Sequence, residues 1–245
     1  ISYTPFAISY TPCAMCYMPF AIRCASKGGF SVLIDMHTHF LPGVDDGCET
    51  IEESLALLNK CKSRGVDLVY LTPHVNHPKY KNTKAHLVEV YESVKSTLES
   101  TGVKTLLGSE VYLTPDLDLT NIIPLGNTSY VLIETALDVF PIYLPDMLFK
   151  LQLSGFRPIL AHVERFLWLQ KDTKLQLYLK DHGVKFQVNY VTFLTYKSNP
   201  MLRRFFSNGW IEFMGSDVHH DGDGRVLLQK DTKIEEFNKD LAYSV

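Results

Sequence analysis

The sequence has no long apolar run and no excess of basic residues, and each shortage excludes a class of protein. None of its apolar runs reaches the ~18 residues that a membrane-spanning helix needs. With 24 Lys and Arg against 27 Asp and Glu, the formal net charge is -3, which gives no support for a nucleic-acid partner or a polybasic membrane patch. The N-terminus also lacks the features of a signal peptide. The composition therefore predicts a globular protein without membrane insertion, and it specifies no oligomeric state.

Cysteine is scarce and confined to the first quarter of the chain. An odd number of cysteines, with none after residue 61, argues against a disulfide framework and favours a reducing cytoplasm. The pair Cys13-x-x-Cys16 has no second pair that would complete a zinc or redox motif. The five thiols are Cys13, Cys16, Cys24, Cys48 and Cys61.

Several common phosphate and metal motifs are also missing. No cysteine is followed by arginine six positions later, so the Cys-x5-Arg phosphate loop is absent. Neither Gly-x4-Gly-Lys-Ser/Thr nor Gly-x-Gly-x-x-Gly occurs, and His-Glu-x-x-His is missing as well. Nucleotide binding and zinc-protease chemistry therefore lose their usual sequence support.

The first 24 residues repeat with a period of seven, as ISYTPFA, ISYTPCA, MCYMPFA and then IRCA. Proline recurs at Pro5, Pro12 and Pro19, which forbids a continuous helix and would interrupt a central strand. Three copies are too few for a solenoid. We expect residues 1–29 to be a low-complexity leader, disordered or non-native, with a short interaction arm as the alternative. Residues 26–29 look like a linker, so the folded domain is expected at 30–245.

Beyond the leader, short apolar runs alternate with helical patterns. Repeated βα units imply parallel strands. A barrel is favoured over an open sheet because polar residues end five of the strands, and a barrel gathers those ends around one mouth. The expected fold is therefore α/β, a closed or nearly closed seven-stranded TIM-like barrel. The expected strands are 32–36, 67–71, 104–107, 130–133, 158–160, 185–188 and 211–214, and the expected helices are 51–64, 84–98, 144–153, 174–181, 201–207 and 234–241.

The stretch 34–47, reading IDMHTHFLPGVDDG, organises the predicted site. Side chains alternate along a strand, so His37 and His39 should point the same way from its end. The acidic pair Asp45-Asp46 follows within one loop. Two imidazoles and a returning carboxylate make half of a metal site.

Other candidate ligands follow the later strands, where a barrel would bring them to the same rim. Mixed imidazole and carboxylate ligands suit zinc, manganese or iron. Eight groups exceed the needs of one ion, so we expect two or three divalent ions, bridged by Glu110 or Asp217. His77, His86, His182 and His220 are interpreted as ordinary loop residues. The eight candidates are His37, His39, Asp46, His74, Glu110, His162, Asp217 and His219.

Such a centre would carry net positive charge and attract an anion, most plausibly a phosphate ester. The expected reaction is in-line attack on phosphorus by a metal-bridging hydroxide. Arg165 follows His162 by three residues, and Arg225 lies in the loop after Asp217. A guanidinium can bind phosphate through two hydrogen bonds, so both arginines are candidate catalytic residues.

The motifs that carry these residues, taken together and in order, resemble those of the PHP-domain metallophosphatases. The resemblance runs from about residue 34 to residue 225 and is nearest to the bacterial capsule-type tyrosine-protein phosphatases. The motifs are His37-Thr-His39, Val44-Asp-Asp-Gly47, Thr72-Pro-His74, Gly108-Ser-Glu110, Ala161-His-Val-Glu-Arg165 and Gly215-Ser-Asp-Val-His219.

The resemblance implies a distorted PHP-type barrel, a trinuclear metal centre built from the eight candidates, and a phosphate held near Arg165 and Arg225. Manganese is the expected metal, with iron or zinc as alternatives. The implied substrate is phosphotyrosine on the tail of a bacterial tyrosine kinase that controls capsular or exopolysaccharide export.

Two other functions stay open at this point. A related phosphatase for a small ester, such as histidinol phosphate, would use nearly the same ligands, so the ligands do not distinguish it. A non-catalytic phosphopeptide-binding barrel is the third hypothesis, although no metal ligand is missing to support it.

Overall fold

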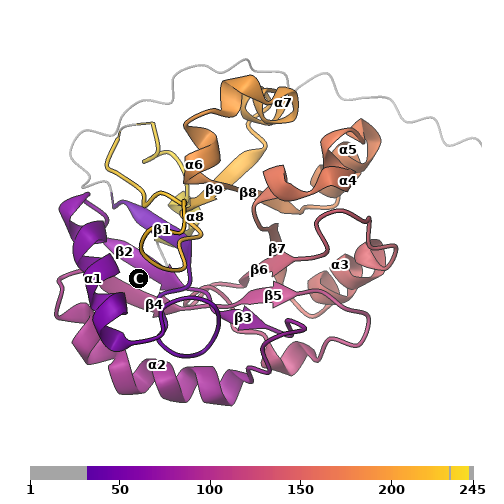
Figure 1. Cartoon of the computed structure of the whole chain (residues 1–245). Coiled ribbons are helices and arrows are strands. Elements are labelled where there is room, and N and C mark those ends of the chain that lie inside the picture. The colour runs from indigo at the N-terminus through magenta and orange to yellow at the C-terminus, as the bar shows by residue number, and fades with distance from the viewer. Residues whose placement is uncertain (1–31, 232, 243–245) are drawn as a thin grey trace, which may run out of the picture. The chain divides into compact units, whose positions relative to one another are not determined.

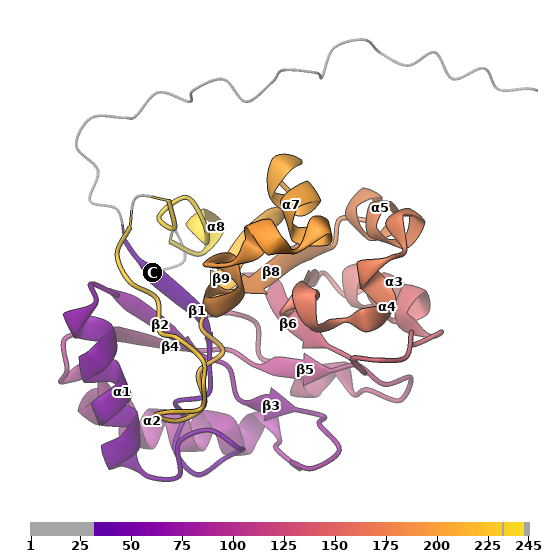
Figure 2. The same ribbon diagram turned by 45° about the horizontal axis from the view of Figure 1, so that its top comes forward.

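The computed structural model describes residues 32–231 and 233–242. The expected leader at 1–29 lies outside the described residues, so its interpretation stays a prediction. The described part alternates strands with helices, and the longer helices lie outside the strands in both views (Figures 1 and 2). Its strands are β1 Ile34–Thr38, β2 Leu68–Leu71, β3 His74–Val75, β4 Lys104–Leu107, β5 Glu110–Tyr112, β6 Tyr130–Glu134, β7 Arg157–Leu160, β8 Lys185–Asn189 and β9 Ile211–Gly215.

Several helices begin at a residue whose side chain caps them. Thr50 accepts a hydrogen bond from the Glu53 amide, and the Glu53 carboxylate accepts one from the Glu49 amide just before the cap. Thr83 and Asp172 each accept a hydrogen bond from an amide in the first turn of a further helix. Of the described residues, none belong to a helix both long and apolar enough to cross a bilayer. The helices are α1 Ile51–Ser63, α2 Lys84–Glu99, α3 Leu144–Leu153, α4 Leu167–Gln170, α5 Thr173–Asp181, α6 Tyr190–Phe193, α7 Pro200–Ser207 and α8 Lys239–Ala242.

All strand pairings are parallel, as the repeated βα pattern predicts. One sheet has the order β1-β2-β4 and the other β3-β5-β6-β7-β8-β9. Only two residues separate β2 from β3, and only two separate β4 from β5. The chain therefore passes from the first sheet into the second at both places. A parallel bridge between Thr38 and Val218 also links the end of β1 to the residues after β9.

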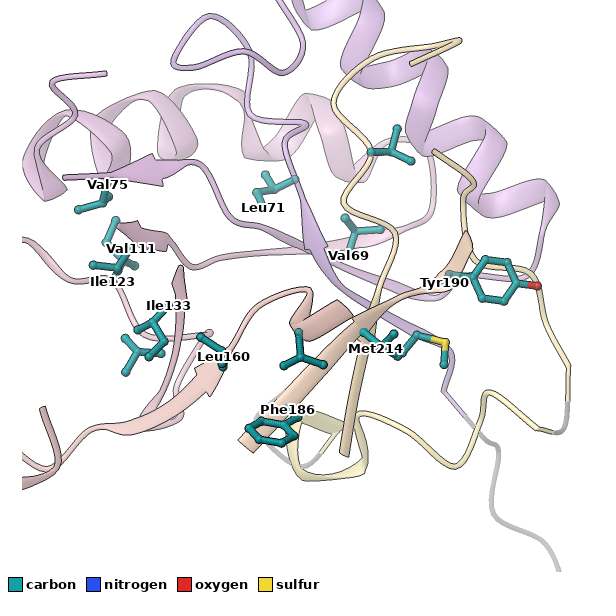
Figure 3. Close-up of a cluster of buried hydrophobic side chains, with 14 of the residues drawn as sticks. Val69, Leu71, Val75, Val111, Ile123, Ile133, Leu160, Phe186, Tyr190 and Met214 are labelled. Carbon is teal, nitrogen blue, oxygen red and sulfur yellow. The ribbon is translucent and has the colours of Figure 1, made fainter. Parts of the chain in front are cut away.

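Successive residues on these strands enter two different hydrophobic clusters. Val69, Ile133 and Met214 belong to the larger cluster, part of which is drawn in Figure 3. Their neighbours Leu132 and Phe213 belong to a smaller cluster. Because strand side chains alternate between faces, strands that feed two clusters are buried on both faces. The polar residues at the strand ends are therefore held on a rigid, doubly packed framework.

Two sequence expectations need correction. β1 runs from Ile34 to Thr38 rather than 32–36, because Val32 is exposed and pairing with β2 begins at Ile34. The last helix is short, Lys239–Ala242, because residues 233–238 form turns and Asn238 adopts a left-handed φ of 60°.

Candidate metal centre

The eight predicted ligands come together where β1, β7 and β9 end and where β3 and β5 begin. His37 and His162, which are 125 residues apart in the chain, have ring centroids 5.8 Å apart. Seven of the eight are buried, and Asp46 is exposed. Among the described residues, three overlapping groups of side chains could each hold a metal ion, because the candidate ligand atoms in each group lie within 4.8 Å of one another. The groups are His39, Asp46, His74 and His219; His37, His39 and Asp217; and His74, Glu110 and Glu134.

Glu110, the first residue of β5, lies at the centre of these groups. Its Oε2 atom is 3.3 Å from Nε2 of His37, from Nε2 of His39 and from Nδ1 of His74. Its Oε1 atom is 3.0 Å from Nε2 of His162. A carboxylate with imidazole nitrogens on both oxygens has the arrangement expected of a ligand shared between two cations.

Asp217, which follows β9, lies beside two of the same imidazoles. Its Oδ1 atom is 3.5 Å from Nε2 of His37 and 3.7 Å from Nε2 of His39. Its Oδ2 atom accepts hydrogen bonds from Arg165 Nη1 and Arg225 Nε, each at 3.3 Å. Asp217 therefore joins the imidazole groups to both arginines.

The exposed edge of the centre is formed by Asp46. Its Oδ1 atom lies 3.4 Å from Nε2 of His74 and 3.5 Å from Nε2 of His219. The His219 ring stacks on the His39 ring with centroids 3.8 Å apart. His74 thus faces Asp46 with one nitrogen and Glu110 with the other, so it lies between two of the groups.

Glu134 is a candidate that the sequence analysis missed. It ends β6, is 8% exposed, and its Oε1 atom lies 3.1 Å from Nδ1 of His74. The available signal was its position, because it follows an apolar strand as Glu110 and Asp217 do. The expected strand at 130–133 stops one residue before it, and no adjacent histidine draws attention to it.

Side chains behind the candidate ligands fix their orientation. The fully buried Asp45 carboxylate lies 2.8 Å from Nδ1 of His39 and accepts hydrogen bonds from the backbone amides of Gly47 and His74. A carboxylate on the distal nitrogen of an imidazole sets its tautomer and leaves Nε2 for a metal. Asp45 therefore supports the site, whereas its neighbour Asp46 faces it.

A second support comes from β8. Gln187 Oε1 accepts a hydrogen bond from the His162 amide at 2.6 Å and lies 3.4 Å from Nδ1 of His37. Gln187 Nε2 donates to Asn189 Oδ1, and Asn189 Nδ2 donates to Asp217 Oδ2 at 2.8 Å. These two amides hold three candidate ligands in place, and sequence reasoning gave them no role.

The backbone near the centre is tightly packed and locally strained. A Cβ atom at Gly47 would overlap the His39 carbonyl oxygen, and one at Gly215 would meet His37. His162 and Asp217 adopt left-handed φ angles of 29° and 56°. Residues without glycine's freedom hold such angles only where their surroundings impose them, and these positions cluster at functional sites.

The charges of the centre are strongly coupled. Burial alone would lower the pKa of His39, but the Asp45 carboxylate raises it to about 9. Burial also opposes the charged form of His74, yet Glu110, the largest opposing influence, helps raise its pKa to about 11. Burial would raise the pKa of Glu110, but the neighbouring imidazoles hold it well below its usual value. His219 differs, since burial lowers its pKa to about 3 and keeps the ring neutral.

The residues present fit divalent metal ions. Nδ1 of His74, Nδ1 of His162 and Oε1 of Glu134 are buried and form no hydrogen bond. Buried polar atoms without partners need an explanation, and His74 Nδ1 and Glu134 Oε1 lie close enough together to share one cation. Imidazoles mixed with carboxylates are the donors that zinc, manganese and iron accept.

A cavity of about 240 Å³ opens over the centre. Arg165 and Arg225 line it together with six of the candidate ligands, so an anion in it would meet both guanidinium groups and the metal-binding side. Of the histidines interpreted as loop residues, His77 packs 4.6 Å from the His74 ring and also lines the cavity. His86 and His220 are exposed, and His182 bonds the Tyr178 carbonyl oxygen.

Comparisons with known proteins identify relatives that match most of this chain. A family model described as capsular polysaccharide synthesis, CpsB/CapC, matches residues 33–237. The chain is 27% identical to the tyrosine-protein phosphatase YwqE of Bacillus subtilis over 86% of this chain and 87% of the relative. It is also 27% identical to the tyrosine-protein phosphatase CpsB of Streptococcus agalactiae, over 86% of this chain and 93% of that one.

One solved structure is similar over most of its length. It comes from work on YwqE of Bacillus subtilis and CpsB of Streptococcus pneumoniae, described there as metal-dependent tyrosine phosphatases. The superposition has a TM-score of 0.69 at 26% identity and covers 86% of this chain and 85% of the other.

Proposed function

The chain belongs to the CpsB/CapC family of capsular polysaccharide synthesis proteins, and on that basis we propose that it is a metal-dependent phosphatase acting on phosphotyrosine in proteins. The observation that carries this proposal is the shared cavity, in which Arg165 and Arg225 reach the same Asp217 oxygen beside the imidazole-carboxylate groups. The relatives named tyrosine-protein phosphatase cover most of the chain.

We propose that two or three divalent ions occupy the centre, with manganese first and iron or zinc as alternatives. When bound, they would lower the pKa of a coordinated water and stabilise the charge of the phosphoryl group. Glu110 is the proposed shared ligand, because imidazoles lie against both of its oxygens. The proposed ligands are His37, His39, Asp46, His74, Glu110, His162, Asp217 and His219, with Glu134 added from the geometry.

The chain's own residues bind and orient the phosphate. Arg165 and Arg225 can each donate two hydrogen bonds to phosphate oxygens while Asp217 Oδ2 holds their side chains over the cavity. Asp45 orients the His39 ring and Gln187 contacts the His37 ring, so little reorganisation is needed when the substrate enters.

We also propose that the two sheets form one distorted seven-stranded barrel of the PHP type, comprising the domain expected at 30–245. Support comes from the seam between β1 and β9. The Asn238 side chain donates to the carbonyl oxygens of Ile34 and Met214 and accepts from the Met214 amide. Nearer the site, the His39 amide donates to the Val218 carbonyl oxygen.

The proposed physiological substrate is the phosphotyrosine-bearing tail of a bacterial tyrosine kinase that controls capsular or exopolysaccharide synthesis, and the proposed location is the cytoplasm. The family description links this chain to capsular polysaccharide synthesis. The buried thiols Cys48 and Cys61 are free, in keeping with a reducing compartment.

The test compares substrates with the protein loaded with manganese. We expect hydrolysis of p-nitrophenyl phosphate and of a phosphotyrosine peptide, loss of both activities after exhaustive chelation, and recovery when manganese returns. Activity that survives chelation would refute the metal-dependent mechanism. A strong preference for histidinol phosphate over the phosphotyrosine peptide would assign the chain to small phosphate esters instead. Tight phosphopeptide binding without turnover in the metal-loaded protein would favour a binding module.

A further inference from the structure

Besides the candidate ligands, the two arginines, Lys79 and Thr135, the cavity is lined by aromatic and apolar side chains. Tyr112 and His77 line it, together with Ala136 and Leu137. The His77 ring meets the Tyr112 ring edge-on, with centroids 5.6 Å apart and an interplanar angle of 89°. All four residues are partly exposed, so a bound molecule can reach them.

The strand geometry places Tyr112 on the same face of β5 as the candidate ligand Glu110. Tyr112 and Glu110 are two residues apart on β5, so their side chains leave the same face, separated by about 6.6 Å along the strand. That separation is comparable to the span from phosphorus to the far side of an ester-linked phenyl ring. A phosphoryl group at the level of Glu110 therefore brings its ester substituent to the level of Tyr112.

The Tyr112 backbone and the His77 ring are both held by neighbouring side chains. Asn76 Nδ2 donates to the Tyr112 carbonyl oxygen at 2.8 Å, and Asn76 takes a left-handed φ of 58° that turns the chain just before His77. The His77 ring stacks on both His74 and Tyr80, at centroid distances of 4.6 and 5.2 Å. A rigid aromatic surface loses little conformational entropy when a flat ring packs against it.

We propose that Tyr112 and His77 form an aryl-binding wall that selects phosphate esters of phenols over those of aliphatic alcohols. The proposal rests on the proposed phosphatase function and adds the side chains that would contact the alcohol-derived part of the phosphate ester. A phenyl ring can stack on one member of the wall and meet the other edge-on, both of which are favourable aromatic geometries. The side chain of phosphoserine has no ring to occupy this surface.

The experiment measures binding rather than turnover, with two non-hydrolysable probes that share one phosphonate head. Phenylphosphonate and methylphosphonate are titrated into the manganese-loaded full chain by calorimetry. Tyr112→Leu removes the ring, Tyr112→Phe keeps it, and Tyr178→Leu is the matched control on the outer helix α5, where Tyr178 is 37% exposed. Circular dichroism confirms that each variant is folded.

We expect wild type to bind phenylphosphonate more tightly than methylphosphonate. Tyr112→Leu should weaken phenylphosphonate about three- to tenfold more than it weakens methylphosphonate, in line with the contribution of an aromatic pair. Tyr112→Phe and Tyr178→Leu should keep the wild-type ratio of the two Kd values.

Equal affinity of wild type for both phosphonates, or an unchanged ratio of the two Kd values in Tyr112→Leu, would overturn the proposal of an aryl-binding wall. If p-nitrophenyl phosphate is still hydrolysed in that case, the phosphatase assignment stands and only the wall fails. If neither phosphonate binds and no ester is hydrolysed, the proposed function itself fails.

Discussion

The Oδ2 atom of Asp45 lies 2.8 Å from Nδ1 of His39, and both side chains are fully buried. Asp45 also accepts hydrogen bonds from the amides of Gly47 and His74, so one carboxylate connects the loop after β1 to the start of β3. Its neighbour Asp46 instead points to the cavity edge. Two adjacent aspartates thus serve different purposes, one orienting a ligand and one available as a ligand.

Asp45→Asn should weaken manganese binding about 10- to 100-fold, the usual effect of losing the partner of a metal-bound imidazole. The substitution keeps the shape of the side chain and removes the charge that favours the required His39 tautomer. Affinity is measured by competition with a chelator. Asp181→Asn, at the exposed end of α5, is the control and should bind as wild type does. Unchanged affinity in Asp45→Asn would show that its charge has no role at the site.

Glu134→Gln should reduce the metal content of the purified protein by about one ion per chain. The carboxylate completes the group formed with His74 and Glu110, and the amide is a much poorer ligand. Elemental analysis gives the number of ions per chain. Glu89→Gln, exposed on α2, serves as the matched control. Full metal content in Glu134→Gln would remove this residue from the proposed ligand set.

Arg225→Ala should raise KM for p-nitrophenyl phosphate roughly tenfold and change kcat by much less. This result follows if the guanidinium binds the phosphate equally in the ground state and the transition state. Steady-state kinetics separates the two parameters, with Arg203→Ala on the exposed side of α7 as the control. A fall in kcat at unchanged KM would assign Arg225 to the transition state instead.

Metal loading should release at least one proton per chain at pH 7.5. In the metal-free protein, carboxylates raise the pKa of His39 to about 9 and of His74 to about 11, so both rings hold protons at this pH. An imidazole must be deprotonated at the ligating nitrogen, so the ions displace these protons and affinity rises with pH, first up to the pKa of His39 near 9 and then less steeply up to that of His74 near 11. His219 contributes none, because its pKa is lowered to about 3.

Calorimetry checks this prediction in two buffers of different ionisation enthalpy at the same pH. The observed heat should differ between them in proportion to the protons released. A heat of manganese binding that is independent of the buffer would contradict the raised pKa values.

Local sequence patterns were sufficient for most of the secondary structure. Thr50 and Gly65 bracket α1 as a cap and a left-handed C-terminal residue, and apolar runs mark the strands. Element ends were less well determined. The turn at Asn238 was missed because its side chain bonds Ile34 and Met214, which are distant in sequence, and no local pattern records such bonds.

The sequence by itself determined which chemical groups the chain can offer, because histidines and carboxylates that directly follow apolar runs can be recognised from their spacing. Only the tertiary structure decided their individual positions. It gave Asp45 and Asp46 different partners, placed Glu134 beside His74, and brought Gln187 against the His37 ring and the His162 backbone amide. The physical reason is that these positions depend on contacts between strands far apart in the chain, where a side chain's orientation follows from parallel pairing, register and packing rather than from its neighbours in sequence.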